Sequence, residues 1–317
     1  MTTKTRFALA GAATLALAPS ACSSASSYEG GSIADDYDLS ELSVTAGSDN
    51  YTEQLVLGQL TIIALEAAGA EVADQTGLGG TQAVRTAITS GEIDLEWDYT
   101  GTAWMGFLGQ TTPIADPMEQ YEAVAEADQE NGLIWGAPTP ANNTYQLVYS
   151  GDTYPDTSFE TVSEIADAVN GGEQVRICVG PEFSVREDGL PGMEDHYGFS
   201  FPSSDVTVLE DGVIYNELVT EGGACEVGVA FATDGRIEAL DLSPVEDDQS
   251  FFPAYNAAMV FRSELVDEFP EAVDLFDEIA EALTNEELQA MNAQVYVDGD
   301  SPANAAEDWL REQGFIG

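Results

Sequence analysis

The chain has 317 residues and a formal net charge of −50 at pH 7, from 58 acidic and 8 basic side chains. This charge argues against nucleic acid and anionic lipid as partners, because a strongly acidic surface repels phosphate groups. The length exceeds that of most single-core domains and favours two lobes over one compact domain.

The first residues have the pattern of an export signal. Lys4 and Arg6 precede an apolar run at residues 7–18, which is too short to span a bilayer and leads to small residues before Cys22. Cys22 and the serines after it resemble the site of a bacterial lipoprotein, in which the cysteine carries lipid and becomes the mature N-terminus. Pro19 departs from the leucine that is usual there, so cleavage by another peptidase is the alternative.

From this pattern we expect a signal peptide at residues 1–21 and a lipoprotein anchored to the outer face of the cell membrane. Residues 22–38 are small, polar and acidic, which is the composition of a flexible tether. No later run is apolar and long enough to span a bilayer.

Cys178 and Cys225 are the two cysteines that remain after Cys22. An even pair in an exported chain favours a disulfide over two free thiols. Neither cysteine has a metal-binding neighbour, because the chain has no CxxC motif and only one histidine, His196. The sequence therefore predicts a disulfide and no metal site.

The basic residues that follow the signal are all arginines. The acidic side chains of the mature chain repel one another at low ionic strength. At 1 M salt the Debye length is only about 3 Å, so this repulsion is largely screened. We therefore expect a halophilic protein whose melting temperature is higher in about 2 M NaCl than in about 0.1 M NaCl. Equal melting temperatures in the two salts would contradict this expectation.

Strand and helix signals alternate from residue 39 onwards. A β-like run at 42–46 precedes a helix at 51–68, in which Asn50 and Glu53 have the spacing of a capping box. A strand at 70–75 and a helix at 81–90 follow.

The segment "EIDLEWDY" alternates apolar and acidic residues, which is typical of a strand with one face towards the core. Trp97 lies on the apolar face. Glu96 and Asp98 lie on the opposite face, where we expect them to be solvated. Tyr99 continues the apolar side as the strand ends.

A helix at 117–130 and a strand at 133–135 lead into "APTPANNTYQLVYS", whose prolines and paired asparagines indicate a crossover. A second α/β set covers about 144–250. A strand in "AYNAAMVF" follows, with helices at 264–283, broken near Pro270, then at 285–293 and 302–313.

This alternation predicts an α/β protein with mainly parallel sheets. Crossovers near 141–144 and 250–255 would join two lobes. We place the first lobe at residues 39–142 and 252–317, and the second at residues 143–251.

The chain is poorly supplied for catalysis. His196 is the only imidazole that could activate a nucleophile, and a lone histidine more often has a packing or surface role. A pair of carboxylates could act as in glycosidases, but among 58 acids chance proximity is expected. We therefore expect a binding protein, with an extracellular carboxylate-dependent hydrolase as the less favoured alternative.

Four aromatic residues stand at expected strand ends beside turn residues: Tyr99, Tyr145, Phe231 and Tyr255. Open α/β sheets bind ligands where strand ends face a cleft. Each ring alone more often belongs to a core, but the shared context of all four favours a site.

Six motifs resemble, in order, those of the substrate-binding proteins of osmoprotectant ABC importers, the family for glycine betaine, choline and related quaternary amines. They are "GSDNYTEQLVLGQL", "GLGGTQAVRTAITSGEIDLEWDYTGT", "NNTYQLVYS", "CVGPEFSVREDGLPGMEDHYGF", "FATDGRI" and "FPAYNAAMV". The resemblance covers about residues 42–315. It implies a two-lobed periplasmic-binding-protein fold of type II, with two crossover strands.

The resemblance also implies an extracytoplasmic monomer without a cofactor, which passes a small ligand to an ABC permease and its ATPase. Its role would be osmoprotection, and lipid would be its only attachment to the membrane.

The resemblance implies an aromatic cage formed by Tyr99, Tyr145 and Tyr255, with Phe231 at a position that the family often fills with tyrosine. A trimethylammonium group has no N–H donor, so only π faces and apolar contacts can recognise it. For the carboxylate of a betaine, the family pattern points to the hydroxyl of Thr102.

The same pattern makes Arg186 a charged donor for that carboxylate and brings the backbone of Asn143 near the ammonium. An arginine can bind a carboxylate through two parallel N–H groups. The alternative for Arg186 is a surface salt bridge to Glu182, Glu187 or Asp188.

Asp49 departs from the family pattern, because many relatives have lysine at this turn position. A lysine there could hold a ligand carboxylate, and an unprotonated aspartate cannot. Asp49 therefore favours a cationic ligand such as choline over glycine betaine, and it is a candidate ligand-binding residue. Alternatively it is an outward-facing charge at a helix N-terminus. Carnitine and ergothioneine are other ligands that the sequence leaves open.

Overall fold

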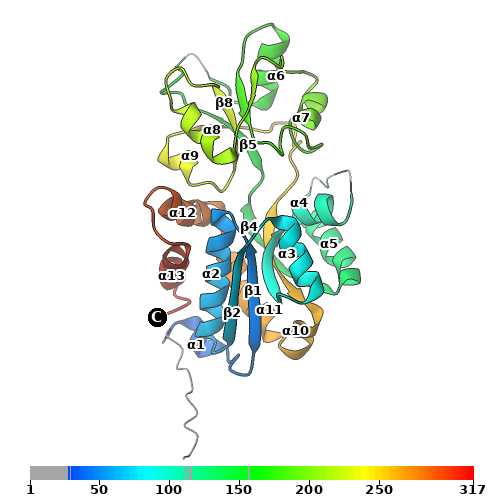
Figure 1. Ribbon diagram of the computed structural model, residues 1–317, viewed down its shortest axis with the longest axis vertical. Helices are drawn as coiled ribbons and strands as arrows, with labels where there is room; N and C mark the ends of the chain where they lie inside the picture. Colours follow the sequence, from blue (N-terminus) through cyan, green and yellow to red (C-terminus); the bar gives the residue numbers. More distant parts are fainter. Residues whose placement is uncertain (1–27, 29, 111, 113, 115, 156–157) are drawn as a thin grey trace, which may run out of the picture.

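The computed structural model describes residues 28, 30–110, 112, 114, 116–155 and 158–317. The predicted signal peptide and Cys22 lie outside these residues. The described chain forms two lobes, each built around a five-stranded sheet, with the first lobe at the bottom of Figure 1 and the second at the top.

The sheet of the first lobe has the order β2-β1-β3-β10-β4. Its strands are β1 (Ser43–Asp49), β2 (Glu71–Leu78), β3 (Leu95–Tyr99), β4 (Leu133–Asn142) and β10 (Asn256–Arg262). β2, β1 and β3 run parallel, whereas β10 runs antiparallel to both of its neighbours.

The sheet of the second lobe has the order β7-β6-β8-β5-β9. Its strands are β5 (Tyr145–Tyr149), β6 (Ile177–Val179), β7 (Val206–Val208), β8 (Val227–Phe231) and β9 (Ser243–Val245). β7, β6 and β8 are parallel, and β5 is antiparallel to β8 and β9. The prediction of mainly parallel sheets is therefore right for only half of each sheet, because β5 and β10 enter from the opposite lobe.

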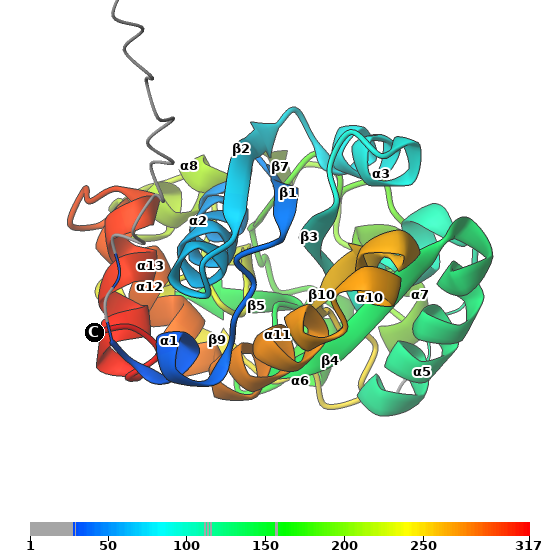
Figure 2. The ribbon, with the colours of Figure 1, turned by 90° about the horizontal axis from the view of Figure 1, so that it is seen from below.

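Helices cover both faces of the first sheet, as Figure 2 shows. Alternate residues of β10 point to the two sides: Met259 packs with the core under α2 (Thr52–Ala67) and α11 (Glu271–Ala282), and Val260 packs with the core under α3 (Thr81–Ser90) and α5 (Pro117–Asp128). The first core also includes residues of α12 (Asn285–Tyr296) and α13 (Pro302–Glu312).

The remaining helices are short. The first lobe adds α1 (Ser32–Asp36), α4 (Thr100–Thr102), η1 (Ala103–Phe107), η2 (Gln129–Asn131) and α10 (Ser263–Glu268). The second lobe has α6 (Val162–Asn170), α7 (Leu190–Tyr197), α8 (Asp211–Leu218) and α9 (Arg236–Ala239). No helix in the described part of the chain combines the length and apolarity needed to cross a membrane.

The end of the predicted tether is part of the fold, so the prediction of a flexible segment up to residue 38 is wrong there. Residues 32–36 form α1, and Ile33 is fully buried in the core of the first lobe. The backbone N–H groups of Ser32 and Ile33 donate to the carbonyls of Gly314 and Phe315. The Ile33 side chain and these hydrogen bonds hold the segment against the first lobe, although its composition is that of a linker.

The two crossovers lie side by side. Asn142 at the end of β4 pairs with Asn256 at the start of β10, and the N–H of Asn143 donates to the carbonyl of Tyr255 at 3.0 Å. We propose that the boundary between the lobes lies here, at residues 142–143 and 251–252.

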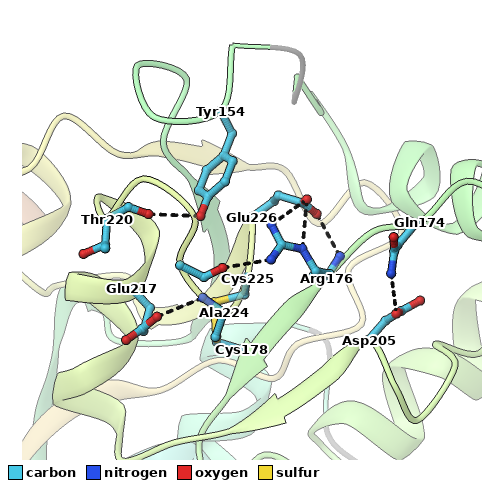
Figure 3. Close-up of polar contacts among 11 residues, drawn as sticks. Tyr154, Gln174, Arg176, Cys178, Asp205, Glu217, Thr220, Ala224, Cys225 and Glu226 are labelled. Carbon is cyan, nitrogen blue, oxygen red and sulfur yellow. Dashed lines mark hydrogen bonds and ion pairs between the residues drawn. A yellow bond between two sulfur atoms is a disulfide. The ribbon is translucent and has the colours of Figure 1, made fainter.

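The predicted disulfide is confirmed. Cys178 in β6 is bonded to Cys225, which lies just before β8 (Figure 3). Beside it, Arg176 forms an ion pair with Glu226 at 2.9 Å and donates to the carbonyl of Gly223 at 2.8 Å. These contacts tie neighbouring strands of the second lobe together.

Candidate functional site

A cleft of about 960 Å³ lies between the lobes. The structure brings all eight of the predicted ligand-binding residues to its wall: Asp49, Tyr99, Thr102, Asn143, Tyr145, Arg186, Phe231 and Tyr255. They come from both lobes and from both crossovers, so the cleft depends on how the lobes are arranged.

Three of the four predicted cage rings form one group around Tyr145. Its ring centroid lies 5.4 Å from that of Phe231 and 6.0 Å from that of Tyr255. Phe183 and Phe252 pack behind Tyr145 with centroids at 4.9 Å and 6.3 Å. These two phenylalanines belong to the core of the second lobe, and no pattern in the sequence distinguished them from other core residues.

Tyr99 stands apart from this group, since no ring contact joins it to another aromatic residue of the described chain. Its side chain is mostly buried, and its hydroxyl donates to Oε1 of Glu53 at 2.5 Å. Thr102 lies close by, at the end of α4. The structure thus places Tyr99 in the cleft wall of the first lobe, with its hydroxyl already engaged.

Asn143 lies between β4 and β5 and contributes to the cleft through its side chain. Its Nδ2 donates to Oε1 of Glu53 at 2.9 Å, while its backbone N–H donates to Tyr255. The backbone N–H of Asn143 is therefore engaged within the crossover. The amide oxygen of Asn143 is buried and has no hydrogen-bond donor among the described residues.

Arg186 combines the two roles that the sequence left open, because it lines the cleft and is paired with Asp188. Its Nε and Nη2 donate to the two carboxylate oxygens of Asp188 at 2.8 and 2.6 Å. Nη2 also donates to the hydroxyl of Tyr255 at 3.1 Å, and Nη1 lies 3.4 Å from Glu182. Burial favours a raised pKa for Asp188, but the hydrogen bonds from Arg186 and Tyr255 hold this pKa below its ordinary value.

Arg236 is a second arginine in the cleft wall, and no pattern in the sequence distinguished it as a site residue. Its guanidinium carbon lies 3.9 Å from the ring centroid of Tyr215 and 4.1 Å from that of Tyr296. Its Nε donates to Asp234 at 2.9 Å, and Nη2 pairs with the other oxygen of that carboxylate at 2.5 Å. Both arginines of the cleft therefore have a bidentate carboxylate partner two residues away in sequence.

Asp49 ends β1 and is 7% exposed, so the alternative of an outward-facing charge is wrong. Its carboxylate accepts hydrogen bonds from Thr81 Oγ1 at 2.9 Å and from the N–H of Asn50 at 2.6 Å. No arginine pairs with it among the described residues. Asp49 thus presents an uncompensated carboxylate to the cleft.

Glu96 and Asp98 are buried, with 5% and 6% of their surface exposed, so the expectation that they are solvated is wrong. The face of β3 that carries them is covered, because helices pack on both sides of this sheet. Both carboxylates line a cavity of about 30 Å³ that shares Asp49, Tyr99 and Thr102 with the cleft. Burial raises the pKa of Asp98 to about 7 and that of Glu96 well above its ordinary value.

The substitution Asp98→Asn should stabilise the protein at pH 8 and have little effect at pH 4, near the ordinary pKa of an aspartate. Because the pKa of Asp98 in the folded state is raised to about 7, the folded protein holds a proton that the unfolded chain has lost. Stability therefore falls as the pH rises from the ordinary pKa of 3.8 through about 7. Each pKa unit corresponds to about 1.4 kcal/mol, so the gain at pH 8 should be a few kcal/mol. Thermal melts at both pH values measure it.

The matched control is Glu130→Gln, which removes one charge from an exposed position. It accounts for the general relief of repulsion in so acidic a chain. An equal effect of the two substitutions at pH 8 would contradict the assignment to burial of Asp98.

Comparisons with known proteins agree with this architecture. Residues 43–312 match the family model described as the substrate binding domain of ABC-type glycine betaine transport systems. The glycine-betaine-binding protein of Pseudomonas aeruginosa is 34% identical over 276 residues, which are 85% of this chain and 88% of that protein. Glycine betaine-binding protein YehZ of Escherichia coli is 30% identical over 277 residues, or 86% of this chain and 91% of that protein.

Two solved structures extend the comparison to the fold. Apo YehZ from E. coli has a TM-score of 0.72 and 30% identity, covering 86% of this chain and 99% of that chain. A structure described as a glycine betaine/carnitine/choline ABC transporter has a TM-score of 0.74 and 26% identity, with the same coverage of 86% and 99%. The matching family model describes a substrate-binding domain of a transport system and not an enzyme, so the alternative of a hydrolase is abandoned.

Proposed function

Because the chain belongs to the family of substrate-binding domains of ABC-type glycine betaine transport systems, we propose that it captures a quaternary ammonium solute in the interlobe cleft. It then presents the solute to an ABC permease that works with its ATPase. The observation that carries this proposal is the group of rings around Tyr145, which shares one cleft with Tyr99.

The rings suit the chemistry of such a ligand. A cation over an aromatic face gains roughly 0.5 to 2 kcal/mol, with the larger values in desolvated sites. Tyr145 and Phe231 come from the second lobe, whereas Tyr99 comes from the first. A ligand that contacts both walls stabilises the closed arrangement of the lobes, because only that arrangement supplies all of its contacts.

The charge of the cleft favours a ligand with a net positive charge, such as choline, over the zwitterion glycine betaine. The two arginines of the wall are each neutralised by an aspartate partner. Besides Asp234, which pairs with Arg236, five further carboxylates line the same cleft: Asp49, Glu53, Glu182, Glu210 and Asp211. A ligand carboxylate would have to compete with Asp188 for Arg186, and a cation meets an excess of negative charge.

Titration calorimetry in about 2 M NaCl tests both the proposed function and the preference for choline. The ligands are choline, glycine betaine, carnitine, proline betaine and ergothioneine. We expect choline to bind more tightly than glycine betaine. Absence of binding to all five solutes would overturn the proposed function. Tighter binding of glycine betaine would retain the function and refute the argument from cleft charge.

We further propose that the protein is a monomer exported as a lipoprotein, with Cys22 as its anchored residue. The export-signal pattern and the serines after Cys22 support lipid anchoring, which would keep the protein near a permease in the membrane. Cys22→Ser should move the protein from the membrane fraction to the medium; retention in the membrane fraction would contradict lipid anchoring through this residue.

A further inference from the structure

Glu53, in the first turn of α2, is a buried carboxylate with 4% of its surface exposed. The predicted capping box is wrong, because its side chain turns towards the cleft instead of the helix end. Oε1 accepts hydrogen bonds from Tyr99 at 2.5 Å and from Asn143 at 2.9 Å. Oε2 accepts from the hydroxyl of Thr233 and from Nδ2 of Asn292, the latter at 2.6 Å.

The four donors belong to separate parts of the molecule. Tyr99 ends β3 and Asn292 lies in α12, both in the first lobe. Asn143 lies on a crossover, and Thr233 follows β8 in the second lobe. One carboxylate therefore joins the two lobes and the segment between them.

The segment around Thr233 is also packed closely on α12. Gln289 Nε2 donates to the carbonyl of Ala232 at 2.7 Å, and Asn292 Nδ2 donates to the carbonyl of Thr233 at 3.0 Å. A Cβ atom on Gly235 would lie 2.4 Å from the carbonyl oxygen of Gln289. Residues 232–236 of the second lobe thus rest directly on a helix of the first lobe.

The network depends on the carboxylate form of Glu53. None of the ion pairs among the described residues includes it, and burial raises its pKa even though Thr233, Tyr99 and Asn292 donate to it. The N-terminus of α2 favours a negative charge at this position. A glutamine would offer one acceptor oxygen and would turn its NH₂ group towards two other donors.

We propose that Glu53 is the positioning residue that fixes Tyr99 in the cleft wall and holds residues 232–236 against α12. The arrangement of the lobes and the shape of the cleft then depend on one carboxylate. The identity of the ligand in this proposal rests on the proposed function, whereas the link between the lobes does not.

Small-angle scattering without ligand tests the link between the lobes. Glu53→Gln and Thr233→Val should each increase the radius of gyration, because they weaken the contact that holds the lobes together. The control is Glu66→Gln, a half-buried acid on the same helix that takes no part in the network and should leave the radius unchanged. Wild-type radii for both test variants would overturn the proposal.

Calorimetry with choline tests the effect on the cleft. Hydrogen bonds to charged groups are strong enough that Glu53→Gln should weaken binding by about tenfold or more. Thr233→Val, which removes a single hydroxyl and leaves the carboxylate in place, should also weaken binding and carries the test if Glu53→Gln fails to fold. Unchanged affinity in a folded variant with an increased radius would refute the coupling to the cleft.

The two proposals fail in different ways. If wild-type protein binds none of the solutes, the proposed function fails, and the scattering comparison still decides whether Glu53 joins the lobes. A lower melting temperature alone would be a purely structural effect, so the radius and the affinity are compared under conditions in which each variant is fully folded.

Discussion

Replacing Tyr145 with alanine should lower the affinity for the quaternary ammonium ligand by about 30-fold, or about 2 kcal/mol. Tyr145 is the ring that contacts both Phe231 and Tyr255, so its loss removes one π face and the support of two others. Calorimetry at high salt, with choline as the ligand, measures the change directly.

The control is Tyr145→Phe, which keeps the ring. Among the described residues the Tyr145 hydroxyl has no hydrogen bond to another side chain, so the phenylalanine variant should bind nearly as well as wild type. Two results would contradict the cage: retained affinity in the alanine variant, or an equal loss in both variants. The second result would indicate that the hydroxyl, and not the π face, contacts the ligand.

Sequence periodicity located many elements of the fold well because it reflects burial. The helix expected at 81–90 is α3, and the helix expected at 51–68 is α2 to within a residue at each end. The strand expected at 133–135 continues to Asn142. The prolines in that segment favoured an early end of the strand. However, β4 lies at the edge of the sheet, where a proline is tolerated because its missing N–H can face away from the neighbouring strand.

The alternating pattern around β3 was misleading for a different reason. Alternation usually indicates one buried and one solvated face, and Glu96 and Asp98 share the polar face. In an α/β sheet both faces carry helices, so these acids lie in the interior, where they share a small cavity with Val84 of α3. The composition of a strand does not show what covers it.

Site residues to which a sequence motif gave a role were predicted, whereas residues that reach the site through long-range contacts were missed. The resemblance identified eight residues that share one cleft. It did not identify Glu53, which has the spacing of a helix cap, or Arg236 and Asn292, which reach the cleft only because α9 and α12 meet. Local patterns carry no information on such long-range contacts.

Removing the disulfide should produce a large loss of stability without touching the cleft. The bond joins residues separated by 47 positions, and the chain-entropy model gives about 4 kcal/mol for a loop of this length. Both cysteines are fully buried. The double substitution Cys178→Ala and Cys225→Ala should therefore lower the melting temperature by on the order of 10 °C in concentrated salt.

Reduction of the wild-type protein separates the effect of the bond from that of the lost sulfur atoms. Under a reductant that opens the disulfide, wild type should melt close to the double variant, whose own melting temperature should not respond. Neither cysteine lines the cleft, so choline affinity at a temperature where both forms are folded should stay unchanged. An affinity that fell with the disulfide would show that β6 and β8 transmit strain to the Tyr145 cluster, because β8 pairs with β5 along its whole length.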